Sequence, residues 1–387
     1  MIRLGFAVLA SAACVLGGGA QAQNEDLIKT KASHAVIMDA ASGDILYGKN
    51  ADEPVPPASM SKLMTVAVVL DLIDQGRLTM ETPFYVSEKA WRTGGSKMFV
   101  LVDTEIAVGD LLKGIIVQSG NDACIVVAEN IAGSEEAFAK LMNARAKAWG
   151  LEESTFANPS GLPDPEQRMS MQDLAKLARH IWNAYPAYRD LFSLQEFTWS
   201  EITQSNRNPL LQTFPGARGM KTGHTDEAGY GVVGLAEKNG ETRIAVVTGL
   251  EDEAERRKAA TALMDAAFDA FATRTFFEPG DIVGSAEVFA GLDDNVPLRI
   301  EQEVTFTLHK KRFEGAEAQL SYEGPLRAPV REGQQVAILT LTIPEEGTRQ
   351  YPLYTAGNVA GLGAFKKITL GLQGLLTPPN IDEEEEG

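Results

Sequence analysis

A run of apolar residues directly after Ser59-Met60-Ser61-Lys62 most constrains what this chain can fold into. Between Leu63 and Leu72 the apolar side chains cover nearly every face of a helix, so a helix from about Ser59 to Ile73 must be buried all round. Only a sizeable domain can surround such a helix. The 387 residues, 44% of them hydrophobic, suffice for two globular units with tails.

The segments around this helix predict an α/β unit. Two strands are expected within 33–48, and two helices within 105–133 that meet at Ser119-Gly120-Asn121. Further helices are expected near 134–149 and 170–184, then two or three strands within 216–250 and a closing helix over 255–273. Strands at both ends with helices between them predict that the two ends meet in one sheet.

The pattern changes after residue 277. Alternation of apolar and polar residues from 278 to 355 indicates a small all-β domain. We therefore predict four parts: a secretory signal peptide (1–22), a catalytic α/β domain (23–277), a small β-sandwich (278–356) and an amphipathic, acidic tail (357–387). The tail suggests peripheral contact with a membrane surface, the alternative being a partly disordered end.

The amino-terminal segment is typical of an exported protein. Arg3 precedes an apolar stretch, and Ala20-Gln21-Ala22 is a small-x-small cleavage site, although a lipid anchor on Cys14 is an alternative. Removal of the segment leaves Cys124 as the single cysteine, interpreted as a small buried residue. No metal-ligand spacing occurs, so neither metal nor cofactor is expected. The net charge of −18 disfavours nucleic acid as a partner.

Ser59 and Lys62 are three residues apart at a predicted helix start, so their side chains lie on one face. A lysine in water is a poor base, but burial and a nearby second cation disfavour its charged form. Such a lysine can accept the proton of a neighbouring serine. Taken alone, the pair favours the simpler interpretation of an N-cap serine followed by a first-turn lysine.

Two further motifs follow in a fixed order. Ser119-Gly120-Asn121 lies in a bend where two short polar side chains can face a cleft. Lys221-Thr222-Gly223 lies in a predicted strand, where a lysine and a hydroxyl can bind a carboxylate and the glycine lets a substrate backbone approach. The trio S-x-x-K, S-x-N and K-T-G is typical of class A β-lactamases and penicillin-binding proteins.

With "PASMSKLMT", "VQSGNDA" and "KTGHTDEAGY", the chain resembles the low-molecular-mass penicillin-binding proteins that act as D-alanyl-D-alanine carboxypeptidases. The resemblance implies an α/β, β-lactamase-like serine-hydrolase domain, with a five-stranded sheet flanked by helices, plus the small C-terminal all-β domain. It implies the D-alanine-ending peptidoglycan stem pentapeptide as substrate, β-lactam antibiotics as covalent inhibitors and a periplasmic location.

The same resemblance implies a role for each matched residue. Ser59 would be the nucleophile and Lys62 its base, Ser119 would pass the proton to the leaving amine, and Asn121 would fix Lys62 and the substrate amide. Lys221 and Thr222 would bind the terminal carboxylate, and the backbone N–H groups of Ser59 and His224 would form the oxyanion hole. Arg207 is expected to bind the substrate carboxylate, with Arg218 as the alternative for that role. Structural roles are expected for Arg256 and for the side chains of His34, His180, His224 and His309.

Three other functions stay open at this stage. A class A-like β-lactamase would need a deacylating glutamate, but the stretch 151–166 lacks the expected E-x-x-L-N pattern. A DD-endopeptidase has the same motifs, although such relatives usually lack the β domain. A non-enzymatic wall-binding protein is disfavoured because Ser59, Lys62, Ser119 and Lys221 are all intact.

Overall fold

The computed structural model describes residues 3–6, 28–344 and 347–363. They fall into two compact units, which divide between Ala272 and Thr273. The strands of the larger unit are β2 (His34–Asp39), β3 (Ile45–Lys49), β4 (Pro83–Tyr85), β5 (Glu105–Ala107), β6 (Glu196–Trp199), β7 (Ile202–Ser205), β8 (Ala217–Thr225), β9 (Gly229–Lys238) and β10 (Glu241–Leu250). Its helices are the 3₁₀ segments η1 (Ala58–Ser61) and η2 (Pro186–Ser193), and α1 (Lys62–Asp74), α2 (Glu88–Arg92), α3 (Val108–Val117), α4 (Asn121–Ala132), α5 (Glu135–Ala148), α6 (Met171–Ala184), α7 (Leu210–Thr213) and α8 (Glu253–Asp269).

The central sheet of this unit has five antiparallel strands in the order β3-β2-β10-β9-β8. Strand β2 pairs with β10, with Asp39 opposite Arg243, so the prediction that the two ends of the unit meet in one sheet is confirmed. Strands β9 and β10 are joined by a two-residue turn. Asn239 and Gly240 both have positive φ there, as the tightest hairpin turns require.

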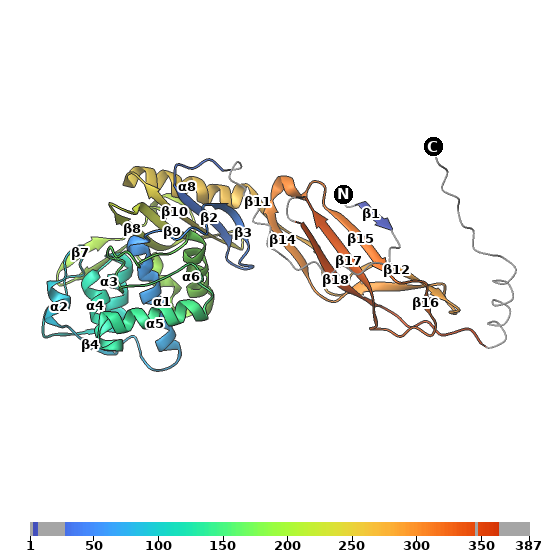
Figure 1. The fold of residues 1–387 in the computed structure, drawn as a ribbon, viewed down its shortest axis with the longest axis horizontal. Coiled ribbons are helices and arrows are strands. Elements are labelled where there is room, and N and C mark those ends of the chain that lie inside the picture. Colours follow the sequence, from blue (N-terminus) through green and yellow to red (C-terminus); the bar gives the residue numbers. More distant parts are fainter. Residues whose placement is uncertain (1–2, 7–27, 345–346, 364–387) are drawn as a thin grey trace. The chain divides into compact units, whose positions relative to one another are not determined.

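Side chains of the sheet alternate between two cores. In β10, Ile244 and Val246 belong to the core that contains α1, whereas Ala245 and Val247 belong to the core that contains α8. Figure 1 shows α8 on one side of the sheet and α1, α3 and α4 on the other.

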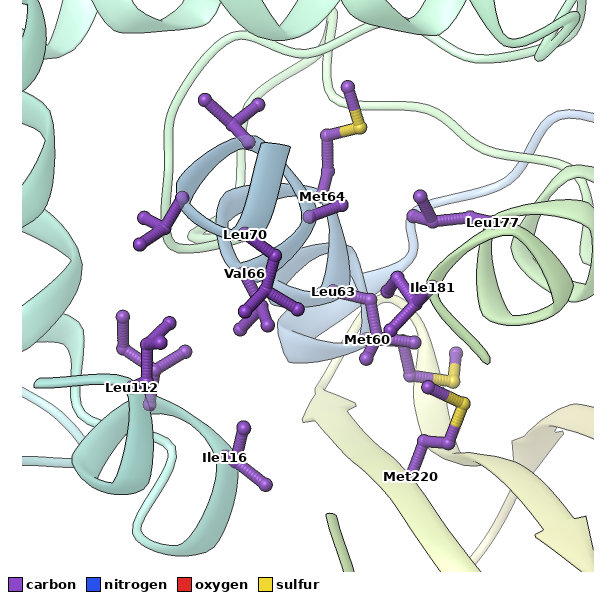
Figure 2. Packing of buried hydrophobic residues seen from close by; sticks show 14 of the residues in the cluster. Met60, Leu63, Met64, Val66, Leu70, Leu112, Ile116, Leu177, Ile181 and Met220 are labelled. Carbon is purple, nitrogen blue, oxygen red and sulfur yellow. The ribbon is translucent and has the colours of Figure 1, made fainter. Parts of the chain in front are cut away.

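Helix α1 is buried on all sides, as its sequence predicts. Every residue from Lys62 to Leu70 is buried, with exposed fractions of at most 1%. Figure 2 shows its apolar side chains packed among residues of α3, α6 and β8; those labelled are Met60, Leu63, Met64, Val66, Leu70, Leu112, Ile116, Leu177, Ile181 and Met220. Lys62 therefore lies at the buried amino-terminal end of this helix.

The prediction for the end of α8 is wrong by four residues. The helix ends at Asp269 instead of continuing to 273, and strand β11 (Phe271–Phe277) begins almost at once and pairs with β14. The sequence Phe-Ala-Thr-Arg-Thr-Phe-Phe is rich in aromatic and β-branched residues, which favour strands.

The smaller unit is all-β, as predicted. Its elements are β12 (Ile282–Phe289), β13 (Asn295–Ile300), β14 (Val304–His309), η3 (Lys310–Phe313), β15 (Glu317–Tyr322), β16 (Leu326–Arg327), β17 (Gln335–Ile343) and β18 (Gly347–Thr355). Its main sheet has the order β1-β15-β17-β18-β13-β12-β16. Strand β1 (Arg3–Phe6) lies within the predicted signal peptide and pairs in parallel with β15.

The first residues of the predicted tail are bonded to this unit. Val359 pairs with Val330, and the backbone N–H of Leu362 donates to the carbonyl of Ala290 at 2.8 Å. Most of the predicted amphipathic helix lies beyond Gly363, outside the described residues. Among the helices that the structure describes, none combines the length and apolar character needed to cross a bilayer.

Candidate active site

Ser59 and Lys62 meet at the junction of η1 and α1. The predicted α-helix starts later than expected: Ser59 lies in the 3₁₀ turn η1 and Lys62 is the first residue of α1. In a 3₁₀ helix, side chains three residues apart lie directly above one another. The Nζ of Lys62 lies 2.7 Å from the Oγ of Ser59.

The bend between α3 and α4 supplies two more polar groups to the same place. Ser119 has a φ of 61°, in the left-handed region, and Asn121 is the first residue of α4. The Oδ1 of Asn121 accepts a hydrogen bond from Lys62 Nζ at 2.8 Å. Lys221 Nζ in β8 donates to Ser119 Oγ at 3.0 Å and to the carbonyl of Thr222 at 2.9 Å. Residues from three distant segments therefore form one connected cluster.

Gly223 lies close to the η1 turn. A Cβ at Gly223 would lie 3.0 Å from the backbone nitrogen of Met60 and 3.0 Å from the carbonyl oxygen of Pro57. The protein's own η1 turn therefore packs closely against this glycine, and the approach of a substrate backbone stays a prediction. This packing places β8, and with it His224, beside the segment that carries Ser59.

The carbonyl of Ser160 is a site group that the sequence analysis missed. Lys62 Nζ donates a hydrogen bond to it. The Oδ1 of Asn158 accepts from the backbone N–H groups of Ser160, Gly161 and Leu162, and thereby shapes this loop. Gly161 has a φ of +74°, and a Cβ there would lie 2.1 Å from the carbonyl oxygen of Ala58. The one signal for this loop in the sequence is the turn pattern "NPSGL".

The three arginines have different surroundings. Arg207 is exposed, and its Nη1 donates to Ser96 Oγ at 2.8 Å. Arg218 pairs with Glu237 at 2.8 Å, which leaves Arg207 as the better candidate for a substrate carboxylate.

Arg256 is buried and belongs to a stack of three side chains. Its guanidinium lies 5.5 Å from the ring centroid of Tyr230, and that ring stacks on His224 with 3.8 Å between centroids. This arrangement fits the structural roles predicted for Arg256 and for the side chain of His224.

Burial dominates the electrostatics of the two lysines. Lys62 is completely buried, and this desolvation, with a smaller contribution from the Arg207 charge, lowers its pKa to about 8. The pKa of Lys221 is also lowered well below its usual range by burial and then by the charges of Lys62 and Arg207. Two ammonium groups in one dry site repel each other, so the site favours loss of a proton.

Cys124 is fully buried, as predicted, and burial raises the pKa of its thiol to about 12. Within residues 3–6, 28–344 and 347–363, no group of three or more His, Cys, Asp or Glu side chains is arranged to hold a metal ion.

Comparison with known families matches both units. The model of the family described as D-alanyl-D-alanine carboxypeptidase matches residues 20–252, and that of the penicillin-binding protein 5 C-terminal domain matches residues 271–360. The chain is 34% identical to D-alanyl-D-alanine carboxypeptidase DacD of Escherichia coli over 86% of this chain and 88% of that protein. It is 32% identical to DacF of Bacillus subtilis over 88% of this chain and 90% of the relative.

Solved structures give the same result. The D-alanyl-D-alanine carboxypeptidase DacD of Francisella tularensis has a TM-score of 0.75 at 30% identity, covering 91% of this chain and 97% of that chain. Penicillin-binding protein 5 of Haemophilus influenzae has a TM-score of 0.71 at 32% identity, covering 86% and 98%. The chain therefore belongs to the serine-type D-alanyl-D-alanine carboxypeptidases, a family of low-molecular-mass penicillin-binding proteins, and carries their penicillin-binding protein 5 type of C-terminal domain.

Proposed function

We propose that Ser59 is the nucleophile and Lys62 the general base with which this chain removes the terminal D-alanine of peptidoglycan stem pentapeptides. The observation that carries the proposal is the environment of Lys62 Nζ, which has Ser59 Oγ at 2.7 Å and two carbonyl oxygens as its other partners.

The three contacts of Lys62 are compatible with the neutral amine that the reaction requires. An uncharged lysine has two N–H groups and one lone pair. Asn121 Oδ1 and the Ser160 carbonyl can only accept, so they take the two N–H groups. The lone pair is then directed at the hydroxyl of Ser59, which has a proton to give. The lowered pKa of Lys62 makes this protonation state accessible near neutral pH.

The reaction then proceeds in two steps. Ser59 Oγ attacks the carbonyl between the last two D-alanines and loses its proton to Lys62. The C–N bond breaks, Ser119 passes the proton from Lys62 to the leaving amine, and free D-alanine departs. Water then cleaves the ester and regenerates Ser59.

The other site residues would bind the substrate and stabilise the oxyanion. Backbone N–H groups of Ser59 and His224 would hold the oxyanion, each typically worth about 3–4 kcal/mol. Lys221, Thr222 and Arg207 would bind the terminal carboxylate, and Asn121 would orient the substrate amide. β-Lactams would acylate the same serine. Penicillin-binding protein D2 of Listeria monocytogenes, 29% identical with a TM-score of 0.57, has been crystallised in an ampicillin-bound form.

The test is the Ser59→Ala variant of the mature chain. It should release no D-alanine from a pentapeptide ending in D-Ala-D-Ala and should not be labelled by a fluorescent penicillin. Ser61→Ala is the matched control, because Ser61 lies in the same η1 turn but its hydroxyl donates to the Ala58 carbonyl and not to Lys62. Persistence of either activity in Ser59→Ala refutes the assignment.

Assays of the same mature chain distinguish two alternative functions, β-lactamase and DD-endopeptidase. Hydrolysis of benzylpenicillin at many turnovers per second would indicate a β-lactamase. Against this, the described hydrogen bond of Lys62 in this loop goes to the backbone carbonyl of Ser160 and not to a carboxylate. Cleavage of cross-linked dimers would indicate a DD-endopeptidase. A D-alanyl-D-alanine endopeptidase of Pseudomonas aeruginosa matches only 51% of this chain, at 31% identity.

We also propose that the protein is exported to the periplasm and that its tail contacts the outer face of the inner membrane. The signal-like amino terminus and the amphipathic pattern of the tail support this. Deletion of residues 364–387 keeps the bonded segment around Val359, so it tests the tail alone. Retention of the shortened protein in the membrane fraction would contradict the proposal.

A further inference from the structure

We infer that Asp122 is a positioning residue for this reaction, because it fixes one wall of the active site against Asn121. The wall segment is Gly94–Val100, which precedes α3 in the chain. The inference rests on the role proposed above for Asn121.

One buried carboxylate binds four backbone N–H groups. Asp122 is fully buried in the first turn of α4. Its Oδ1 accepts from the N–H groups of Met98 and Ala123 at 2.8 and 2.9 Å, and its Oδ2 accepts from Phe99 and Val100 at 2.8 and 3.2 Å. Three successive N–H groups that converge on one anion form a concave site for negative charge. The wall segment is thereby tied to the helix that carries Asn121.

The wall segment in turn orients Asn121. The Nδ2 of Asn121 donates to the carbonyl of Gly94 at 3.0 Å, and its backbone N–H donates to the carbonyl of Ser96 at 2.8 Å. With the NH₂ group bound to Gly94, the amide oxygen faces Lys62. A rotated amide would present N–H groups to an amine that needs acceptors, and would displace the lone pair of Lys62 from Ser59.

The wall segment also contacts Arg207. Ser96 Oγ accepts the hydrogen bond from Arg207, the candidate carboxylate ligand. Phe99 has a φ of 70°, which is unfavourable for an aromatic residue. This backbone conformation brings the N–H groups of Met98, Phe99 and Val100 to one carboxylate, and loss of the carboxylate would allow the segment to relax.

The test is the acylation rate constant of the mature chain with a fluorescent penicillin, together with kcat and KM for D-alanine release. Asp122→Asn keeps the shape of the side chain but replaces an acceptor by a donor. We expect a fall in acylation of about tenfold or more, with kcat affected more than KM.

Asp173→Asn is the matched control. Asp173 is also buried in the first turn of a helix, α6, and accepts from the Glu153 N–H and the Ser154 hydroxyl at 2.8 and 2.9 Å. Its partners do not contact the site, so this variant should lose stability but keep the wild-type acylation rate.

A double-mutant cycle separates positioning from general damage. In an Asn121→Ala background, Asp122→Asn should cost clearly less than in the wild type, because only the contact of the wall segment with Arg207 is left to disturb. An equal loss in both backgrounds, or wild-type acylation by Asp122→Asn, overturns the inference alone. Wild-type acylation by Asn121→Ala itself overturns the proposed role of Asn121 and the inference with it.

If Asp122→Asn fails to fold, Gly95→Ala is a second variant that tests the inference. Gly95 is exposed, and a Cβ there would lie 2.8 Å from Asn121 Nδ2. Gly95→Ala therefore disturbs the contact between the wall segment and Asn121 while Asp122 is intact. It should lower acylation by a similar factor, and a folded Gly95→Ala protein with the wild-type rate overturns the inference.

Discussion

Acylation of Ser59 should slow as the pH falls below about 8, because Lys62 becomes protonated and can no longer accept the serine proton. Burial lowers the pKa of Lys62 from 10.5 to about 8. The neutral fraction is then about one half at pH 8 and roughly 1% at pH 6. A lysine with an ordinary pKa would be only about 0.3% neutral at pH 8. We therefore expect a rate that rises about tenfold per pH unit up to 7 and levels off above pH 9.

The assay is the rate of labelling by a fluorescent penicillin between pH 5.5 and 9.5, with far-ultraviolet circular dichroism at each pH to confirm folding. A control variant changes the side chain of His224, whose backbone N–H is proposed for the oxyanion hole. His224→Asn keeps the backbone N–H and should keep the midpoint near pH 8. A rate that does not change between pH 6 and 9, or a midpoint above pH 10, would refute the reasoning.

The same pKa shift affects stability. The unfolded chain has a lysine of ordinary pKa, so between pH 8 and 10.5 it binds more protons at this group than the native protein does. The contribution of Lys62 to the free energy of unfolding should therefore rise with pH across this window. A shift of 10.5 − 8 = 2.5 units corresponds to about 3 kcal/mol. Urea titrations of the wild type and of Lys62→Met across this window measure the contribution, and parallel pH profiles of the two proteins would contradict it.

Three further results are expected. Arg207→Gln removes a charge that lowers the pKa of Lys62, so the midpoint of the acylation profile should move to higher pH; an unchanged midpoint would contradict this. Gly161→Ala places a Cβ 2.1 Å from the Ala58 carbonyl, so it should displace the Ser160 carbonyl and lower acylation at least tenfold, and a wild-type rate would contradict the role of that loop. Arg243→Met leaves the carboxylate of Asp39 buried without its ion-pair partner and should lower the free energy of unfolding by about 3–5 kcal/mol in urea titrations. Arg299→Met is its control, because the ion pairs of Arg299 are open to solvent and its loss should be much smaller.

Side-chain chemistry is the part of the candidate site that can be predicted from the residues themselves. The hydroxyl of Ser59, the amine of Lys62 and the amide of Asn121 can be recognised by type and spacing, and the all-round apolar pattern of α1 predicts the burial that lowers the pKa of Lys62.

The groups that were missed are backbone groups, or a side chain whose partners are backbone groups. Any residue could supply the carbonyl at Ser160, so its identity carries no signal. Gly223 was recognised as a site of close approach, but which chain approaches depends on tertiary packing. Asp122 stands beside a recognised motif, yet its partners lie more than twenty residues earlier, and only the fold brings them to it.

The pairing of β2 with β10 has a consequence for synthesis. The partners Asp39 and Arg243 are separated by about two hundred residues, so a nascent chain that emerges amino end first holds β2 long before its neighbour exists. Contacts of such long sequence separation form late and slowly. Ser59 and Lys62 would thus be made early but could not yet react, because their surroundings are incomplete without β10. That strand leaves the ribosome only after most of the polypeptide has been translated.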